Sequence, residues 1–155
     1  DLLAIRLPRS VHIHGDMFRR MVVSGRADMT PNPSPDAIAQ LNLRYDLAAM
    51  AADRCAEDGF DAVVQDLILG KDLADFVKRI ASPERYLVVL SPSVSALDWR
   101  EEMRRKAAHL RLSARALDEV LRRETAQIGY WLDCSTLTTE ETVEDILANL
   151  QRAAV

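Results

Sequence analysis

Short runs of aliphatic residues alternate along the chain with longer segments of helical periodicity, and this alternation constrains the fold most. Runs at residues 10–14, 62–66 and 86–90 predict strands, and residues 130–134 predict a fourth. The second and third runs are continuously β-branched or aliphatic, which is typical of strands covered on both faces in a parallel sheet. The pattern therefore predicts parallel strands connected by helices.

The segments between these runs carry the start and stop signals of helices. Ser34 is a favoured N-cap, Pro35 takes the first helical position, and Gly59 is a typical C-terminal stop. Thr138 and Glu141 form a capping box before the last segment. The expected helices cover residues 35–58, 72–80, 94–106, 113–127 and 139–152, and residues 1–7 are expected to be the tail of another. Strands alternating with helices form βαβ units, so we expect a three-layer α/β/α fold with a parallel sheet.

Composition excludes several classes of protein. The 155 residues are enough for one domain with its own core. A net charge of −4 argues against a general nucleic-acid binder, and the longest apolar runs are too short to span a membrane. Cys55 and Cys134 lack metal-ligand spacing, so we expect two buried thiols in a cytoplasmic protein. We expect a monomer or a homodimer.

Two aspartates follow strands at the edge where parallel sheets bind ligands. Asp16 comes after the first predicted strand and Asp66 ends the second. A carboxylate in this position can take a proton from a substrate hydroxyl or hold Mg²⁺. Each can also simply cap the turn or helix that follows, but two carboxylates facing one crevice favour a functional role.

Basic residues gather in two places. Arg100, Arg104, Arg105 and Lys106 lie within seven residues and suit phosphate oxygens, but the charge pattern alone favours a solvated face paired with Glu101 and Glu102. Arg19, Arg20 and Arg44 are placed to hold an anionic substrate group or to form surface salt bridges. Residues 24–35 contain three alternate prolines and are expected to form a stiff loop over the site.

The histidines suggest one further alternative. His12 and His14 share a strand face, and Asp16 completes a His-x-His-x-Asp spacing that could hold zinc. Further ligands are not obvious, which disfavours a metal there. The sequence has no Gly-x-Ser-x-Gly elbow and no Gly-x-Gly-x-x-Gly fingerprint, which argues against a serine hydrolase and a dinucleotide-binding enzyme.

Several segments resemble a known family. His12–Arg20, with the sequence HIHGDMFRR, looks like the second-strand segment of small P-loop phosphotransferases, the ATP-binding kinases grouped with chloramphenicol phosphotransferase. Residues 63–70 (VVQDLILG), 87–93 (LVVLSPS) and 129–146 resemble the third, fourth and last strands, in order. The resemblance implies a P-loop NTPase-like sheet of order 2-3-1-4-5.

The resemblance also implies roles for the residues singled out above. Asp16 would be the general base, and Asp66 would match the carboxylate near Mg²⁺. The basic cluster would lie in a lid at about residues 100–112 and bind the phosphates of ATP. Arg19, Arg20 and Arg44 would face the acceptor substrate.

The phosphate-binding loop of the family is not in the sequence. No Gly-x-x-x-x-Gly-Lys-Ser/Thr occurs, and the first strand is missing with it. We expect both in a segment of roughly 20 to 30 residues before Asp1, the span of a strand, a loop and the start of a helix. Residues 1–155 would then be one N-terminally incomplete kinase-like domain.

These inferences predict an ATP- and Mg²⁺-dependent kinase that phosphorylates a hydroxyl of a small molecule such as an antibiotic, a nucleoside or a sugar. One alternative is a nucleotide-binding regulatory module that transfers no phosphate. Another is an interaction domain that binds no nucleotide, in which the basic residues are only surface.

Overall fold

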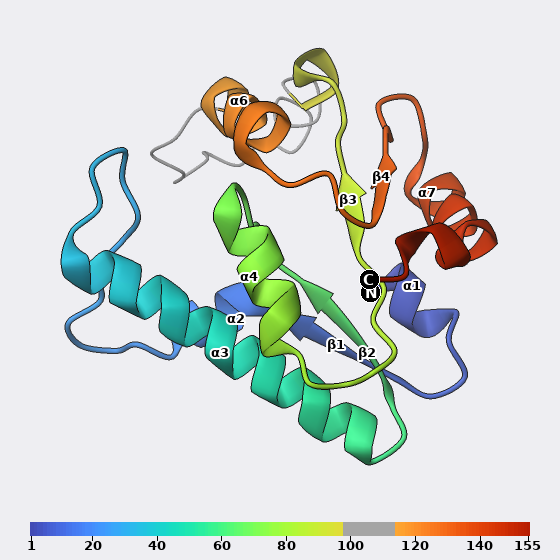
Figure 1. Ribbon diagram of the computed structural model, residues 1–155, viewed down its shortest axis with the longest axis horizontal. Coiled ribbons are helices and arrows are strands. Elements are labelled where there is room, and N and C mark those ends of the chain that lie inside the picture. The colour runs from blue at the N-terminus through green and yellow to red at the C-terminus, as the bar shows by residue number, and fades with distance from the viewer. Residues whose placement is uncertain (98–113) are drawn as a thin grey trace. The chain divides into compact units, whose positions relative to one another are not determined.

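The computed structural model describes residues 1–97 and 114–155 and has a mixed α/β fold (Figure 1). The chain divides into two compact units. The first consists of Asp1–Ile68 and Lys78–Pro83, and the second of Leu69–Val77 and Glu84–Val155. A single domain remains a prediction, and the two units are described one by one.

The first unit is built around a pair of parallel strands. Strands β1 (Ser10–His14) and β2 (Asp61–Gln65) pair in register, from Ser10 opposite Asp61 to His14 opposite Gln65. The strands lie within one residue of their predicted bounds, and their parallel pairing confirms the prediction. The helices of this unit are α1 (Leu2–Ile5), α2 (Gly15–Arg20) and α3 (Pro35–Glu57).

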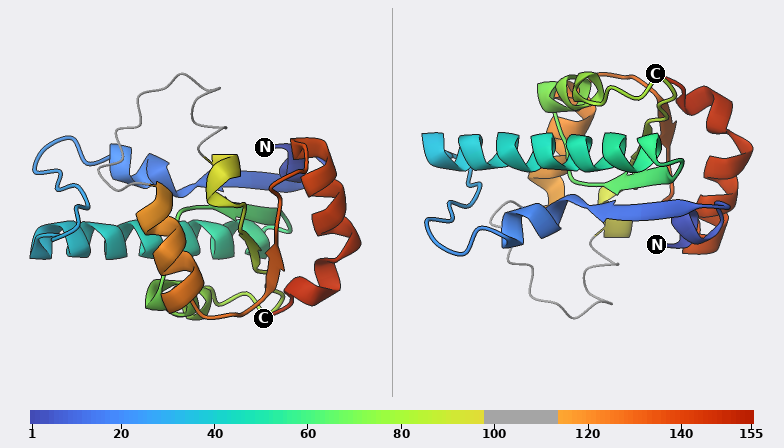
Figure 2. Two further views of the ribbon diagram at one scale, coloured as in Figure 1. Left: turned by 90° about the horizontal axis from the view of Figure 1, so that it is seen from above. Right: turned by 90° about the horizontal axis from the view of Figure 1, so that it is seen from below.

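The long helix α3 begins and ends at the predicted signals. The Ser34 side chain accepts a hydrogen bond from the backbone N–H of Ala37, and Gly59 adopts a positive φ of 76° just beyond the end. Figure 2 shows α3 running alongside β1 and β2. Small side chains make up most of the packed face of α3. Four of its five buried residues are alanines, and the five are Ala37, Tyr45, Ala48, Ala49 and Ala52. Ile38, which the periodicity also assigns to the apolar face, is 46% exposed.

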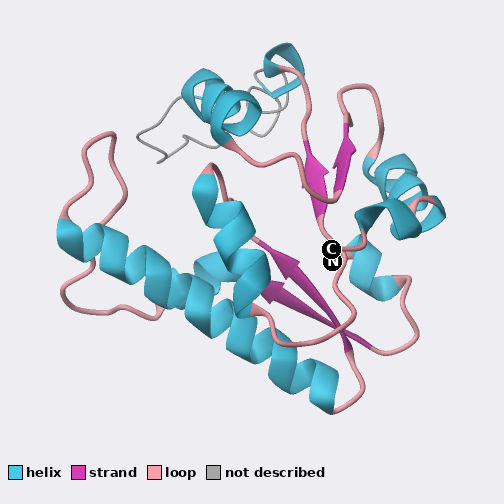
Figure 3. Cartoon of the chain, in the orientation of Figure 1, coloured by secondary structure: helices cyan, strands magenta, loops and turns pink. Residues whose placement is uncertain are grey.

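The second unit contains the other parallel pair. Strands β3 (Val88–Leu90) and β4 (Tyr130–Leu132) pair with Val88 opposite Tyr130 (Figure 3). This unit also holds α6 (Ala114–Glu124), α7 (Thr139–Ala148) and the short 3₁₀ helix η1 (Leu150–Ala153). Helix α4 (Lys71–Arg79) begins in the second unit and ends in the first. The helices predicted at 72–80 and 113–127 are confirmed with shifted ends.

One edge of β2 has no strand partner among the described residues. The N–H of Asp61 donates to the carbonyl of Arg9 at 2.8 Å, so Asp61, Val63 and Gln65 turn their backbone groups toward β1. The backbone groups of Ala62 and Val64 therefore face the opposite edge. Within the described ranges, β1 is the only strand paired with β2.

Strand β3 has the same kind of edge. The N–H of Tyr130 donates to the carbonyl of Leu87 at 2.8 Å, so alternate residues of β3 face β4. The backbone groups of Val88 and Leu90 point away from β4. Leu90 is 48% exposed. Across residues 1–97 and 114–155, the strands thus form two separate pairs rather than one sheet.

Four sequence predictions need correction. Val63 and Val64 are only half-buried, so β2 is not fully covered on both faces by the described residues. Gly15 and Asp16 begin α2 rather than a turn, and an acidic residue in the first turn favours the helix. The last helix ends at Ala148, where the backbone of Asn149 leaves helical geometry, and η1 follows. Of the two cysteines expected to be buried, Cys134 is buried and Cys55 is only half-buried.

Part of the predicted phosphate-binding region lies outside the described residues. This holds for the lid at 100–112 and for all four members of the basic cluster, Arg100, Arg104, Arg105 and Lys106. Of the helix predicted at 94–106, residues 94–97 are described and are helical. No helix in the described part of the chain has the length and apolar character needed to cross a membrane.

Candidate functional site

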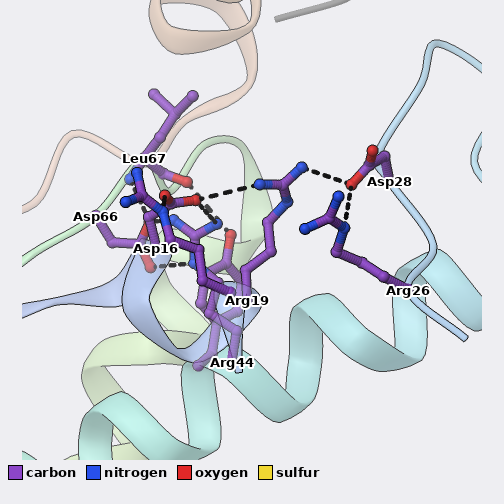
Figure 4. A network of polar contacts seen from close by, with 9 residues as sticks. Asp16, Arg19, Arg26, Asp28, Arg44, Asp66 and Leu67 are labelled. Carbon is purple, nitrogen blue, oxygen red and sulfur yellow. Dashed lines mark hydrogen bonds and ion pairs between the residues drawn. The ribbon is translucent and has the colours of Figure 1, made fainter. Parts of the chain in front are cut away.

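Two aspartates meet at the carboxyl ends of β1 and β2. Asp16 lies in the first turn of α2, which follows β1 directly, and Asp66 is the first residue after β2. Because His14 pairs with Gln65, the two strands end at the same level. Figure 4 shows both carboxylates beside the side chain of Arg44 at this edge, as predicted, but the Asp66 side chain is 0% exposed, so the prediction that both face one crevice is wrong for Asp66.

Asp66 is buried and paired with Arg44. Its side chain is 0% exposed, and that of Arg44 is 15% exposed. The Nε of Arg44 donates to Oδ2 of Asp66 at 2.7 Å, and Nη2 donates to Oδ1. The backbone N–H of Leu67 donates to the same Oδ1 at 2.7 Å. The carboxylate therefore accepts a bidentate, charge-assisted pair from Arg44 and a third hydrogen bond from the backbone.

Gly15 makes room for this carboxylate. A Cβ atom at position 15 would overlap the Oδ2 and Cγ atoms of Asp66. Gly15 is itself buried and directly precedes Asp16. The absence of a side chain at this position therefore allows Asp66 to reach Arg44 beneath the start of α2.

Asp16 is the exposed carboxylate of the pair and lies among three arginines. Its side chain is 41% exposed, and Arg20 Nε donates to its Oδ2 at 2.8 Å. Arg19 Nη1 lies 3.6 Å from Oδ1, and Arg44 Nη1 lies 3.9 Å from the same oxygen. The three arginines predicted to face the substrate are thus all gathered around Asp16.

The loop after α2 adds residues that sequence reasoning missed. Asp28 accepts a hydrogen bond from Arg19 Nη2 at 2.6 Å, and Arg26 Nε lies 3.9 Å from the same oxygen. Gln40 of α3 holds the loop, since its side chain accepts from the N–H of Ala27 and donates to the carbonyl of Gly25 at 2.9 and 2.8 Å. From the sequence, only the expected position of this loop over the site indicated that Arg26 and Asp28 could take part in it.

The electrostatics of the site depend mainly on the burial of Arg44. Burial lowers the pKa of its guanidinium below the ordinary value, and the charge of Asp16 acts in the opposite direction. Four arginines, including Arg26, here contact three aspartates, so the network carries a net positive charge. A partly exposed carboxylate with a cationic rim can accept a proton from a hydroxyl group while the arginines hold an anion.

Mg²⁺ does not fit Asp66 as these side chains are arranged. Carboxylate oxygens are suitable donors for this ion, but both oxygens of Asp66 accept hydrogen bonds from Arg44. A metal ion bound directly to Asp66 would have to displace a guanidinium group that is itself mostly buried. The role of Asp66 near the metal therefore stays a prediction that this geometry does not support.

The His-x-His-x-Asp set, which the sequence offered for zinc only as a disfavoured alternative, is not brought together around Asp16. The rings of His12 and His14 lie 4.1 Å apart, but Asp1 takes the place expected for Asp16. Nδ1 of His12 lies 2.6 Å from the carboxylate of Asp1, and Nε2 lies 3.1 Å from the side-chain oxygen of Gln65. Both ring nitrogens of His12 already have partners, so we assign no metal to this group.

Comparison with known proteins adds no assignment to this geometry. No protein-family model matches the chain, and no curated protein is significantly similar to it. The interpretation of the site therefore depends on the contacts of its own residues.

Proposed function

We propose that this chain is part of an ATP-dependent phosphotransferase that moves the γ-phosphate to a hydroxyl group of a small molecule. The proposal depends on the groups that surround Asp16. This residue is a partly exposed carboxylate at the end of a parallel strand, and three arginines lie within 4 Å of its oxygens. This arrangement can activate a hydroxyl group and hold an anion at the same place.

In the proposed reaction, the substrate hydroxyl lies against Asp16. Its oxygen attacks the γ-phosphorus, the bond from that phosphorus to the bridging oxygen of ADP breaks, and the hydroxyl proton passes to the carboxylate of Asp16. Phosphoryl transfer requires mainly positioning and neutralisation of charge. A carboxylate at the site of attack and cations around it supply both.

The arginines around Asp16 keep donors for a substrate. A guanidinium group has five N–H donors, and Arg20 is seen to use its Nε on Asp16. Arg19 contacts Asp16 and Asp28 through different terminal nitrogens, so its guanidinium group lies between the two carboxylates. Anionic or hydroxyl oxygens of the acceptor can therefore bind beside the carboxylate that accepts the proton.

The strand pairing supports the P-loop NTPase-like sheet. In the order 2-3-1-4-5, the present strands β1 to β4 correspond to the second, third, fourth and fifth. The two edges that the first strand would pair with are the outer edges of β2 and β3. Those are the edges at which Ala62, Val64, Val88 and Leu90 face no strand among residues 1–97 and 114–155.

In the proposed enzyme, the phosphates of ATP bind residues other than Asp16 and the arginines around it. The resemblance assigns them to the phosphate-binding loop and to the basic cluster that ends at Lys106. Mg²⁺, when bound with ATP, neutralises charge on the phosphates. The acceptor side of the reaction is the part that Asp16, Arg19, Arg20 and Arg44 carry.

A phosphate-transfer assay on the full-length protein tests the proposal. The protein is incubated with Mg²⁺ and ATP labelled in the γ-phosphate, together with a panel of antibiotics, nucleosides and sugars. We expect transfer to one class of hydroxyl compound, and a loss of about 100-fold or more in Asp16→Asn, the usual size for a general base. Asp46→Asn, which removes a carboxylate paired with Arg79 elsewhere in the same unit, is the matched control and should keep its activity.

Two outcomes contradict the proposal. If Asp16→Asn transfers phosphate as fast as the wild type, Asp16 is not the base. If the protein binds nucleotide but phosphorylates no compound of a broad panel, a nucleotide-binding regulatory module is the better explanation.

A further inference from the structure

The ion pair between Asp66 and Arg44 uses only one edge of the guanidinium group. Asp66 accepts hydrogen bonds from Nε and Nη2, the two nitrogens along that edge. The third nitrogen, Nη1, is left facing Asp16, with 3.9 Å between it and Oδ1. The orientation of Arg44 toward the exposed carboxylate is therefore determined by a buried carboxylate on the other side.

Asp66 is itself held from several sides. The Leu67 N–H binds Oδ1, and the carboxylate occupies the space that a side chain at position 15 would need. The Asp66 side chain is 0% exposed, so water does not compete for its oxygens. A carboxylate held in this way makes a rigid support for a long and otherwise flexible arginine side chain.

We propose that Asp66 is a positioning residue, which holds Arg44 so that its Nη1 group faces Asp16 and a ligand bound there, and that it is not a direct ligand of Mg²⁺. Gly15 contributes to the same arrangement, because it provides the space for the Asp66 carboxylate. The part of the inference that concerns the substrate rests on the proposed function, whereas the anchoring of Arg44 does not.

If Asp66 instead bound Mg²⁺ directly, its contacts with Arg44 would have to change. A metal ion at Asp66 would take at least one of the oxygens that Arg44 now uses. Arg44 would then lose at least one of its two hydrogen bonds to Asp66 while its side chain is only 15% exposed, which weakens the pairing of a mostly buried charge. The two roles thus differ in what happens to the Nε–H of Arg44 when Mg²⁺ is added.

Nuclear magnetic resonance of the arginine Nε–H groups measures this directly on the full-length protein. An Nε–H that donates to a buried carboxylate exchanges slowly with water. Arg44→Lys, which has no Nε–H, assigns the signal of Arg44. We expect that signal to stay protected when Mg²⁺ and then Mg²⁺–ATP are added at millimolar concentration. Loss of its protection on addition of Mg²⁺ would overturn the proposal, and this measurement is made on the wild-type protein.

A pair of matched variants provides the second arm. Asp66→Asn keeps the shape of the side chain but cannot form the bidentate ion pair, so the Nε–H of Arg44 should exchange about tenfold faster or more. Asp46→Asn should instead change only the signals of Arg79, its partner at 2.6 Å. Affinity for Mg²⁺–ATP should stay within about twofold in both variants, since a large loss in Asp66→Asn is the result expected of a metal ligand.

The transfer assay separates this inference from the proposed function. With Asp66→Asn we expect the KM for the acceptor to rise about tenfold or more, because Arg44 is misplaced, with a smaller change in kcat. Rescue by Asp66→Glu, even if partial, is expected for an anchoring carboxylate. If the wild type transfers no phosphate, the proposed function fails, while the exchange of the Arg44 signal still decides whether Asp66 is its anchor.

Discussion

The two units use their polar side chains in different ways. In the first, aspartates and arginines contact one another around Asp16, and one ion pair is buried. In the second, the described ion pairs join residues four apart on α6, and several other polar side chains bind the backbone, as when Thr125 accepts from the N–H of Gly70 at 2.7 Å and Ser135 from the N–H of Ser93 at 2.8 Å. Side chains that bind backbone groups stabilise loops, whereas charges gathered around an exposed carboxylate indicate a site for a ligand.

The largest expected effect comes from breaking the buried ion pair of the first unit. Arg44→Met leaves the Asp66 carboxylate buried without its partner, which should lower the free energy of unfolding by roughly 3 to 5 kcal/mol. Urea unfolding followed by circular dichroism measures the loss. The double variant Arg44→Met, Asp66→Leu should regain most of it, because the buried charge is gone. A loss below about 1 kcal/mol in the single variant would mean that water reaches Asp66.

In the second unit, the largest effect should come from a glycine. Gly129 has a φ of 70°, and a Cβ there would overlap the carbonyl of Leu87, which accepts the hydrogen bond of Tyr130 between β3 and β4. Gly129→Ala should cost about 2 to 3 kcal/mol, more than the strain of the backbone alone. Gly25→Ala is the control, since Gly25 has a φ of 73° but no atom within 4 Å of the added Cβ. Equal losses of stability in the two variants would show that the contact with Leu87 has no effect.

A smaller loss is expected at the start of α7. The Thr138 side chain accepts from the N–H of Glu141 at 3.1 Å, and the Glu141 carboxylate accepts from the N–H of Thr138 at 2.8 Å. Thr138→Ala removes half of this capping box and should cost about 1 kcal/mol in urea unfolding. Thr138→Ser, which keeps the hydroxyl, should stay close to the wild type. Phosphate transfer should be unchanged in both, because α7 contributes no residue to the site.

The last and smallest expected effect is a change in how stability falls at alkaline pH. The hydroxyl of Tyr130 donates to Asp145 at 2.6 Å, and this bond, with burial and the charge of Asp145, raises the pKa of Tyr130. The stability it contributes is therefore complete below the ordinary pKa of about 10 and is lost as the pH rises through the raised value. Tyr130→Phe should lower stability by about 1 kcal/mol at neutral pH and reduce its fall above pH 10. An identical alkaline profile in the variant would assign the fall to other groups.

Local signals explain the part of the fold that could be predicted. The bounds of β1, the cap at Ser34 and the capping box at Thr138 each depend on a few neighbouring residues, and all are present in the structure. Helix α2 was missed because six residues are too short for a visible period and Gly15 suggests a turn. The parallel pairing of β1 and β2 then brings Asp16 and Asp66 together, as strand alternation predicts.

The contacts inside the site were less accessible to sequence reasoning. Arg44 and Asp66 are 22 residues apart, and nothing in their local sequence indicates which arginine pairs with which aspartate. The role of Asp28 depends on the path of an irregular loop that Gln40 holds in place. Such contacts follow from the tertiary structure, because side-chain pairs between distant segments leave no periodic pattern.

Titration calorimetry of the full-length protein with Mg²⁺–ATP tests the central claim most directly. The protein is expressed with any residues that its gene encodes before Asp1. The proposed phosphotransferase predicts binding in the micromolar range, unchanged in Asp16→Asn, since Asp16 contacts the acceptor rather than the nucleotide. Absence of any binding heat at millimolar Mg²⁺–ATP would contradict the account and would make an interaction domain without nucleotide the better explanation of this chain.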